Sequence, residues 1–174
     1  MEAFWRKGYE ATSLVDLTER TGLNKASLYR VFGDKHELFK AALKNYADME
    51  FREVMAVAFN SDSPLENIRA VVSKITTDFT HEKGCLMINS LVELGPHDAE
   101  VKDMLQDFAE KRIRAMTDMI GQAREAGEIR AELDPVRLSY SLMIALAGSA
   151  AMAKGFMTRE QIVGNLENLI DSWT

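Results

Sequence analysis

The sequence predicts an all-α protein with two parts: a helix-turn-helix head over residues 1–44 and a helical body over residues 45–174. Apolar residues recur at spacings of three and four along most of the chain, the period of an amphipathic helix, and no alternating run of useful length indicates a strand. Ser, Thr, Asn or Asp stands before most of these runs, and Gly or Pro follows many of them. These observations favour consecutive helices joined by short turns.

Four helices are expected before the first clear break, each bounded by a cap or a stop: residues 2–7, 13–20, 24–32 and 34–59. Gly8 supplies the stop of the first helix. Ser13 with Asp16, and Asp34 with Glu37, have the three-residue spacing in which a cap and a reciprocal acceptor close a helix start.

Five further helices are expected in the body, over residues 64–79, 85–94, 98–126, 135–154 and 158–173. Residues 60–64 form the clearest loop, with Ser63 and Pro64 suited to the cap and first turn of the next helix. Gly127 is the expected stop of the longest helix, which would span roughly 43 Å at about 1.5 Å per residue.

Composition excludes several classes of protein. The chain is 47% hydrophobic and 28% charged, as globular proteins are. No apolar run approaches the roughly 18–20 residues of a membrane span, so no membrane partner is expected. A single cysteine, Cys85, excludes an internal disulfide framework and fits a reducing compartment, so we expect a cytoplasmic protein.

The net charge of −6 is distributed unevenly. Residues 1–44 hold eight Lys or Arg against six Asp or Glu, a net charge of +2, whereas residues 45–174 hold 13 against 21, a net charge of −8. An acidic body with a mildly basic head suits DNA binding at one end of the molecule.

The third expected helix has the residues of a DNA reader. Leu28, Val31 and Phe32 are expected to face inward, which leaves Lys25, Ser27 and Arg30 outward with Tyr29 at the edge. Arg30 could donate two hydrogen bonds to a guanine, and Tyr29 could touch a thymine methyl group or a phosphate. Helix starts at Ser13 and Lys35 favour phosphate. The predicted DNA contacts are Ser13, Asn24, Lys25, Ala26, Ser27, Tyr29, Arg30 and Lys35.

This region resembles the DNA-binding head of the tetracycline-repressor (TetR) family. The matched positions are Phe4, Gly8, Tyr9, Thr12, Ser13, Asp16, Leu17, Gly22, Leu23, Lys25, Ser27, Leu28, Tyr29, Phe32, Lys35 and Leu38. The resemblance implies an all-helical homodimeric repressor, whose second and third helices read double-stranded DNA and whose fourth helix joins the head to a ligand-binding body. The simpler alternative is an ordinary helical hairpin, in which Ser13 and Asn24 are only caps.

The start of the chain departs from the family pattern. Met1 falls inside the first expected helix, where family members usually have a longer helix preceded by a basic arm. We therefore expect this chain to lack the start of that helix, and to bind DNA weakly or to have a loosened head.

The body is rich in methionine, with ten in the whole chain. Methionine fills irregular space and adapts to varied ligands, which favours an effector pocket, although plain core packing is the alternative. The resemblance implies the pocket for a small apolar or amphipathic effector. Its predicted lining is Phe79, Met87, Leu91, Phe108, Met116, Met119 and Met143.

A homodimer interface is expected at the C-terminal end. Residues 139–154 are rich in Ala, Gly and Ser, which let helices approach closely. The last helix adds an apolar face made of Ile162, Leu166, Leu169, Ile170 and Trp173. Packing within one chain is the alternative for both helices.

No residues form a convincing catalytic or metal-binding set. His36, His81 and His97 lie in separate segments, and Cys85 beside two apolar residues suits a buried core position better than an electrophile sensor. We therefore expect no cofactor and no enzymatic activity. The prediction is a repressor released from a palindromic operator by its effector; the alternative is a helical small-molecule-binding protein or enzyme that does not bind DNA.

Overall fold

The computed structural model describes residues 1–77 and 83–174, and within these ranges it is all-helical, as the sequence predicts. Its helices are α1 (Glu2–Lys7), α2 (Leu14–Thr21), α3 (Lys25–Phe32), α4 (Lys35–Met55), α5 (Pro64–Thr77), α6 (Leu86–Glu93), α7 (Ala99–Glu125), α8 (Pro135–Met152) and α9 (Arg159–Asp171). None of the helices in these ranges is both long enough and apolar enough to cross a membrane.

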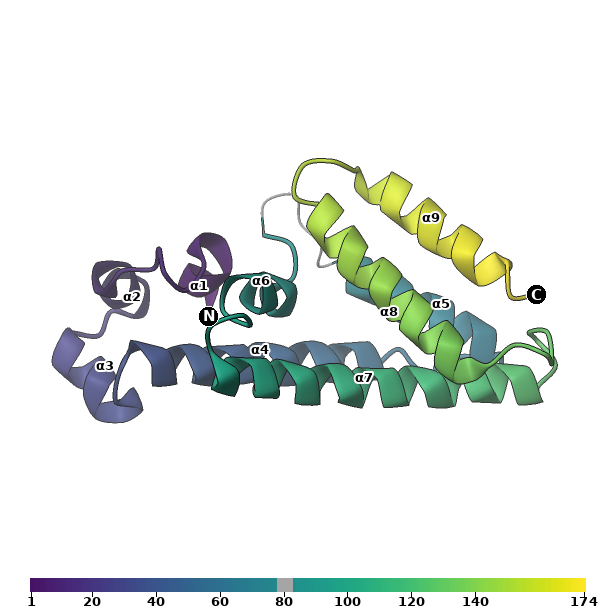
Figure 1. Cartoon of the computed structure of the whole chain (residues 1–174), viewed down its shortest axis with the longest axis horizontal. Coiled ribbons are helices and arrows are strands. Elements are labelled where there is room, and N and C mark those ends of the chain that lie inside the picture. Colours follow the sequence, from purple (N-terminus) through teal and green to yellow (C-terminus); the bar gives the residue numbers. More distant parts are fainter. Residues whose placement is uncertain (78–82) are drawn as a thin grey trace.

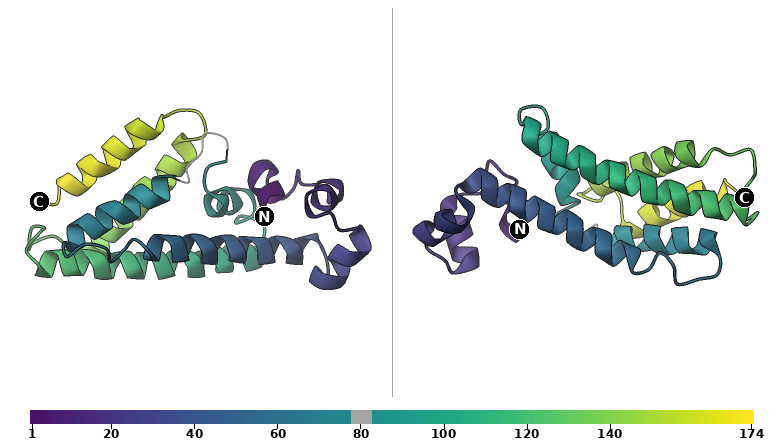
Figure 2. Two further views of the ribbon diagram at one scale, coloured as in Figure 1. Left: turned by 180° about the vertical axis from the view of Figure 1, so that it is seen from behind. Right: turned by 90° about the horizontal axis from the view of Figure 1, so that it is seen from below.

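The molecule is elongated, with α4 and α7 running in the same direction along its long axis (Figure 1). Helices α1, α2 and α3 gather at the N-terminal end of α4, whereas α5, α8 and α9 pack at the other end. Helix α6 lies between the two groups, as both orientations of Figure 2 also show. The arrangement separates a small head from a larger body and leaves α4, α6 and α7 to connect them.

Local hydrogen bonds explain where the helices begin and end. The Ser13 hydroxyl accepts a hydrogen bond from the Asp16 N–H (3.1 Å), and the Asp16 carboxylate accepts one from the Ser13 N–H (2.8 Å). At the end of α7, Gly127 adopts the left-handed conformation with φ of 73°. The N–H of Glu128 there reaches the carbonyl of Ala123 (2.9 Å), which closes the helix in a Schellman motif.

One predicted boundary is wrong. Helix α4 ends at Met55 and not near Phe59. Hydrogen bonds from the Val57 N–H to Val54 and from the Ala58 N–H to Met55 tighten the chain into a turn. The turn buries Ala58 completely and leaves Phe59 61% exposed, so tertiary packing overrides the helical pattern.

The other boundaries agree with the sequence to within the usual scatter of helix ends. Helices α8 and α9 end at Met152 and Asp171, each two residues earlier than predicted. Helix α5 reaches Thr77 within the described range. Phe79 and His81 lie outside the described residues.

Two clusters of buried side chains form the core. The first fills the body and contains Val54, from the C-terminal half of α4. The second underlies the head and contains Leu43 from α4, together with Leu86 from α6 and Val101 from α7. Residues 1–44 therefore do not close a core alone, because body helices complete it.

Candidate nucleic-acid interface and ligand pocket

Buried side chains on one side of α3 fix the orientation of this helix. Leu28 is 1% exposed and Leu17 of α2 is 3% exposed, so both belong to the core of the head. Gly22 makes the turn between the helices with φ of 68°, a conformation that Gly adopts without steric cost. The Asn24 side chain then accepts a hydrogen bond from the Ser27 N–H (2.9 Å) and starts α3.

The opposite side of α3 carries the predicted DNA contacts. Lys25, Ala26 and Arg30 are exposed, and Ser27 and Tyr29 are partly buried. The Lys25 ammonium lies 5.6 Å from the centre of the Tyr29 ring, which keeps these two side chains together. The structure thus brings five of the predicted residues onto one helix at the far end of the head (Figure 1).

The prediction that Val31 faces inward is wrong, because Val31 is 64% exposed. In this helix of eight residues the core is contacted by Leu28 and, one turn on, by the partly buried Phe32. Val31 lies beside that line and adds an apolar group to the exposed surface.

The remaining predicted contacts flank α3. Ser13 is exposed at the start of α2, where Lys7 also pairs with Asp16. The Lys7 ammonium and the capping hydrogen bonds lower the pKa of Asp16 to about 2. At the start of α4, Lys35 lies with its ammonium 4.5 Å from the centre of the Tyr9 ring.

Helix α6 and the residues just before it hold the head through hydrogen bonds between a side chain and a main-chain group. The Glu93 carboxylate accepts from the N–H groups of Tyr9 and Glu10, each at 2.9 Å. The indole N–H of Trp5 donates to the carbonyl of Gly84 (3.0 Å), just before α6. Any displacement of α6 would therefore act directly on α1 and on the turn that follows it.

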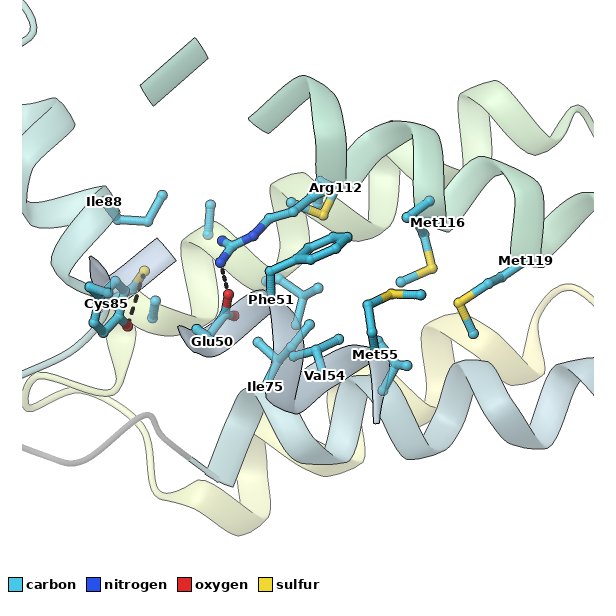
Figure 3. Close-up of a pocket in the computed structure, with 17 residues that line it drawn as sticks. Glu50, Phe51, Val54, Met55, Ile75, Cys85, Ile88, Arg112, Met116 and Met119 are labelled. Atoms are coloured by element: carbon cyan, nitrogen blue, oxygen red, sulfur yellow. Dashed lines mark hydrogen bonds and ion pairs between the residues drawn. The ribbon is translucent and has the colours of Figure 1, made fainter. Parts of the chain in front are cut away.

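A pocket with a cavity volume of about 80 Å³ lies beside α6 and is walled by α4, α5, α6, α7 and α8 (Figure 3). A water molecule requires about 10–15 Å³ of such space, so the cavity has room for a molecule of several heavy atoms. Three of the predicted residues, Met116, Met119 and Met143, line it.

The other predicted pocket residues lie elsewhere. Met87 is buried in the core beneath the head, and Phe108 packs partly buried against the same core. Leu91 is 45% exposed and does not line the cavity. The position of Phe79 falls outside the described ranges.

Two charged residues in this pocket were not among the predicted site residues. Glu50 of α4 and Arg112 of α7 form an ion pair whose side chains are only 10% and 18% exposed (Figure 3). Burial lowers the pKa of Arg112 to about 10, so the guanidinium remains protonated at neutral pH. Glu50 lies four residues after the buried Tyr46, and Arg112 four before the buried Met116. A charge on the apolar stripe of a helix could have identified both.

Tyr46 and Cys85 also line the pocket. The Tyr46 hydroxyl lies 3.8 Å from the Cys85 sulfur, to which it donates. Burial raises the pKa of both groups, which disfavours the thiolate that electrophile sensing requires. Cys85 is therefore best described as a buried wall residue.

A charged cluster joins the starts of α4 and α7. His36, Glu37 and Glu100 place possible metal-ligand atoms within 4.8 Å of one another. The Lys40 ammonium already pairs with both glutamates, at 2.7 Å and 2.5 Å, and His36 Nε2 lies 2.6 Å from Asp98 Oδ2. The cluster can be explained as an ion-pair network between the two helices.

Helix α8 exposes a row of apolar side chains at spacings of four and eight residues. Their exposed fractions range from 46% to 72%, and they are Val136, Tyr140, Ile144 and Met152. Helix α9 and the residues after it differ: Ile162, Leu166, Ile170 and Trp173 are at most 2% exposed within the single chain. The expectation that these four residues form a dimer surface is therefore wrong, and the alternative of packing within one chain holds for them.

Two family models match this chain. Residues 1–42 match the model described as bacterial regulatory proteins, tetR family, and residues 63–167 match that of the tetracyclin repressor-like C-terminal domain.

Curated relatives are regulators. The chain is 30% identical to the HTH-type transcriptional repressor ComR of Escherichia coli (strain K12), over 94% of this chain and 80% of that protein. It is 32% identical to the uncharacterized HTH-type transcriptional regulator YezE of Bacillus subtilis (strain 168), over 76% and 70%.

Solved structures share the fold. A cysteine mutant of the TetR family transcriptional regulator CifR, complexed with 26-bp double-strand operator DNA, superposes with a TM-score of 0.86 at 27% identity, covering 99% of this chain and 91% of that one. The regulatory protein TetR of Rhodobacter sphaeroides gives a TM-score of 0.88 at 21% identity, covering 99% and 94%. The second likeness concerns the fold alone.

Proposed function

Because the chain belongs to the TetR family of bacterial regulatory proteins and is a DNA-binding transcriptional regulator, we propose that it is a dimeric repressor released from a palindromic operator by a small apolar or amphipathic effector. The observation that carries the proposal is the double role of α4 and α6, which contribute both to the core of the head and to the wall of the pocket. In this proposal residues 1–44 bind DNA, and residues 45–174 bind the effector and form the dimer.

The exposed side of α3 suits the major groove. Arg30 has the forked donors that pair with a guanine edge, and Tyr29 can contact a thymine methyl group. Lys25 and Ser27 supply further donors, and the small Ala26 allows a close approach of the backbone. Asn24, Ser13 and Lys35 border this surface and are proposed to position it on phosphates.

The pocket suits an effector with a hydrocarbon body. Met116, Met119 and Met143 give it a deformable apolar lining, which accommodates varied shapes. An effector that occupies the pocket would press on Ile88 of α6 and on Met55 of α4. Since α6 is hydrogen-bonded to the head through Glu93, occupancy would change the position of the head.

The exposed apolar row of α8 supports a homodimer. Tyr140 and Ile144, 52% and 72% exposed, lie at its centre. Apolar patches of this kind mark interfaces, and a two-fold dimer would present two copies of α3 to the same DNA. Half-sites about one helical turn apart, ~34–36 Å, are then expected. The proposed location is the cytoplasm, where bacterial DNA lies.

Selection of bound sequences from a pool of random duplex DNA at near-physiological salt tests the proposal. We expect enrichment of a palindrome with half-sites one turn apart. Recovery of a single half-site would contradict the dimer, and recovery of no preferred sequence would contradict sequence-specific operator binding. The second result would favour the alternative of a helical small-molecule-binding protein without DNA function.

A further inference from the structure

The charges in the pocket cancel. Among the described residues that line it, Glu50 and Arg112 are the charged ones, and they are paired with each other. Glu50 Oε2 and one terminal nitrogen of Arg112 are buried without a further hydrogen-bond partner. The rest of the wall is almost entirely hydrocarbon, thioether and aromatic, with the Tyr46 hydroxyl and the Cys85 thiol at one end.

A ligand with a net charge would disturb this balance. An anion that took the guanidinium would leave Glu50 as an unpaired buried carboxylate, and a cation that took the carboxylate would leave Arg112 unpaired. An unpaired charge away from water is strongly unfavourable, so either exchange opposes binding. An uncharged ligand leaves the pair intact.

The pair nevertheless offers hydrogen bonds to a polar ligand atom. A guanidinium has five N–H donors and a carboxylate has two acceptor oxygens. A single contact between the two groups leaves some of these donors and acceptors available. A hydroxyl group donates and accepts at once, so a single hydroxyl oxygen could accept from Arg112 while its proton is donated to Glu50. A carbonyl oxygen could satisfy only Arg112.

Resting on the proposed effector-binding function of this pocket, we propose that its ligand is an uncharged amphipathic alcohol or phenol. The hydroxyl group of the ligand lies against the Glu50–Arg112 pair, and its hydrocarbon body lies against Met55, Met116 and Met119. The pair thereby selects for a neutral polar end, and the methionines accommodate the shape of the remainder.

Binding of three straight-chain probes, each with six carbon atoms in all, tests this inference: 1-hexanol, hexanoate and hexylamine. Calorimetric titration of the full chain at pH 7 should give the tightest binding for 1-hexanol, by about tenfold over either ion, because only the ions leave an unpaired charge in the pocket. Glu50→Gln should move the preference toward hexanoate. Arg112→Gln should move it toward hexylamine.

A matched control is Glu53→Gln. Glu53 lies on the same helix as Glu50 but pairs with Lys74 (Nζ to Oε2, 2.7 Å) and does not line the pocket, so its replacement should keep the wild-type order of the probes. Thermal melting checks that each variant is folded. If a pocket variant does not fold, the order measured for the wild-type chain still decides.

The outcomes are separable from those of DNA binding. Tightest binding of either ion to the wild-type chain would overturn the inferred ligand class while leaving the pocket as an effector site. Failure of all three probes to bind would also overturn it, whatever the DNA selection yields. Binding of 1-hexanol by a chain that selects no DNA sequence would uphold this inference and contradict the proposed repressor.

Discussion

Side chains of the proposed DNA-reading surface are positioned by local contacts that can be predicted from the sequence. Asn24 caps α3 through a hydrogen bond to the backbone three residues on, and Leu28 fixes the buried side of the helix. Arg30 is consequently exposed, and its direction does not depend on contacts with distant parts of the chain.

Replacement of Tyr29 or Arg30 by Ala should weaken binding to the selected operator by about 1–3 kcal/mol and relax the preference at one or two base pairs. Lys35→Ala should instead weaken binding to all sequences alike, as loss of a phosphate contact does. Fluorescence anisotropy with matched and mismatched duplexes measures both effects.

Arg114→Ala is the control for these variants, since it removes an exposed arginine from the body and should leave DNA affinity unchanged. Unchanged base preference in both Tyr29→Ala and Arg30→Ala would contradict base reading by α3.

Ionisation of the Asp16 carboxylate makes the stability of the head depend on pH. Its pKa falls from 3.8 to about 2 because it pairs with Lys7 and accepts hydrogen bonds from Ser13. A depressed pKa contributes stability above the unfolded value, and this contribution is lost as the pH falls from 3.8 through about 2.

Asp16→Asn should therefore lower the free energy of unfolding at pH 7. The difference in this free energy between the variant and the wild type should become smaller below pH 3.8. Denaturant titrations at pH 7, 4 and 3 provide the measurement. A difference that stays constant or widens in acid would show that the ionised carboxylate is not the stabilising species.

The pocket could not be predicted residue by residue for a physical reason. Met87 and Met116 have similar helical patterns around them, but only the packing of five helices decides which one borders a cavity. The charged pair was detectable in principle, since Glu50 and Arg112 interrupt apolar stripes. Their pairing across two helices was not, because it depends on the register of α4 against α7.

Helix α6 connects the pocket directly to the head. It contributes Ile88 to the cavity wall and Glu93 to the backbone of the head. Hydrogen bonds to a charged acceptor contribute about 1.5–3 kcal/mol each, so the Glu93 contacts are a substantial part of what holds the head.

Glu93→Ala should make the head less stable against local opening and should leave the stability of the body unchanged. Amide hydrogen exchange should become faster in residues 1–34 and stay unchanged in α8 and α9, which do not touch this contact. The control is Glu110→Ala, which removes an exposed glutamate of α7 and should change hydrogen exchange in neither region. Equal protection of the head in Glu93→Ala and wild type would contradict the role of α6.

Helix starts and stops were mostly predictable because caps are local. The Ser13–Asp16 box and the Gly127 stop each depend on residues within a few positions in the chain. The end of α4 was not predictable, since burial of Ala58 in the body core shortens the helix. Local chemistry thus accounts for the element order, and long-range packing for the exception.

In the whole molecule, binding to a palindromic operator requires two heads at a fixed separation. Ile144→Glu places a charge on the most exposed apolar position of α8 and should convert the dimer to monomers. Light scattering after size exclusion measures the change, and operator affinity should fall with it. Val92→Glu, which changes an equally exposed apolar residue of α6 (75%), should leave the dimer intact. Monomeric wild-type protein, or a dimer that survives Ile144→Glu, would contradict this interface.

In the proposed repressor, the pocket and the DNA-binding surface are energetically coupled. The most direct measurement is the affinity of the full chain for its selected operator with and without saturating 1-hexanol, or whichever of the three probes binds, paired with the affinity for that probe with and without operator. Coupling of the two sites should make each ligand weaken the binding of the other by the same factor, about 5–150-fold, because linkage is reciprocal. Operator affinity that does not change when the pocket is filled would show that the two sites are not coupled.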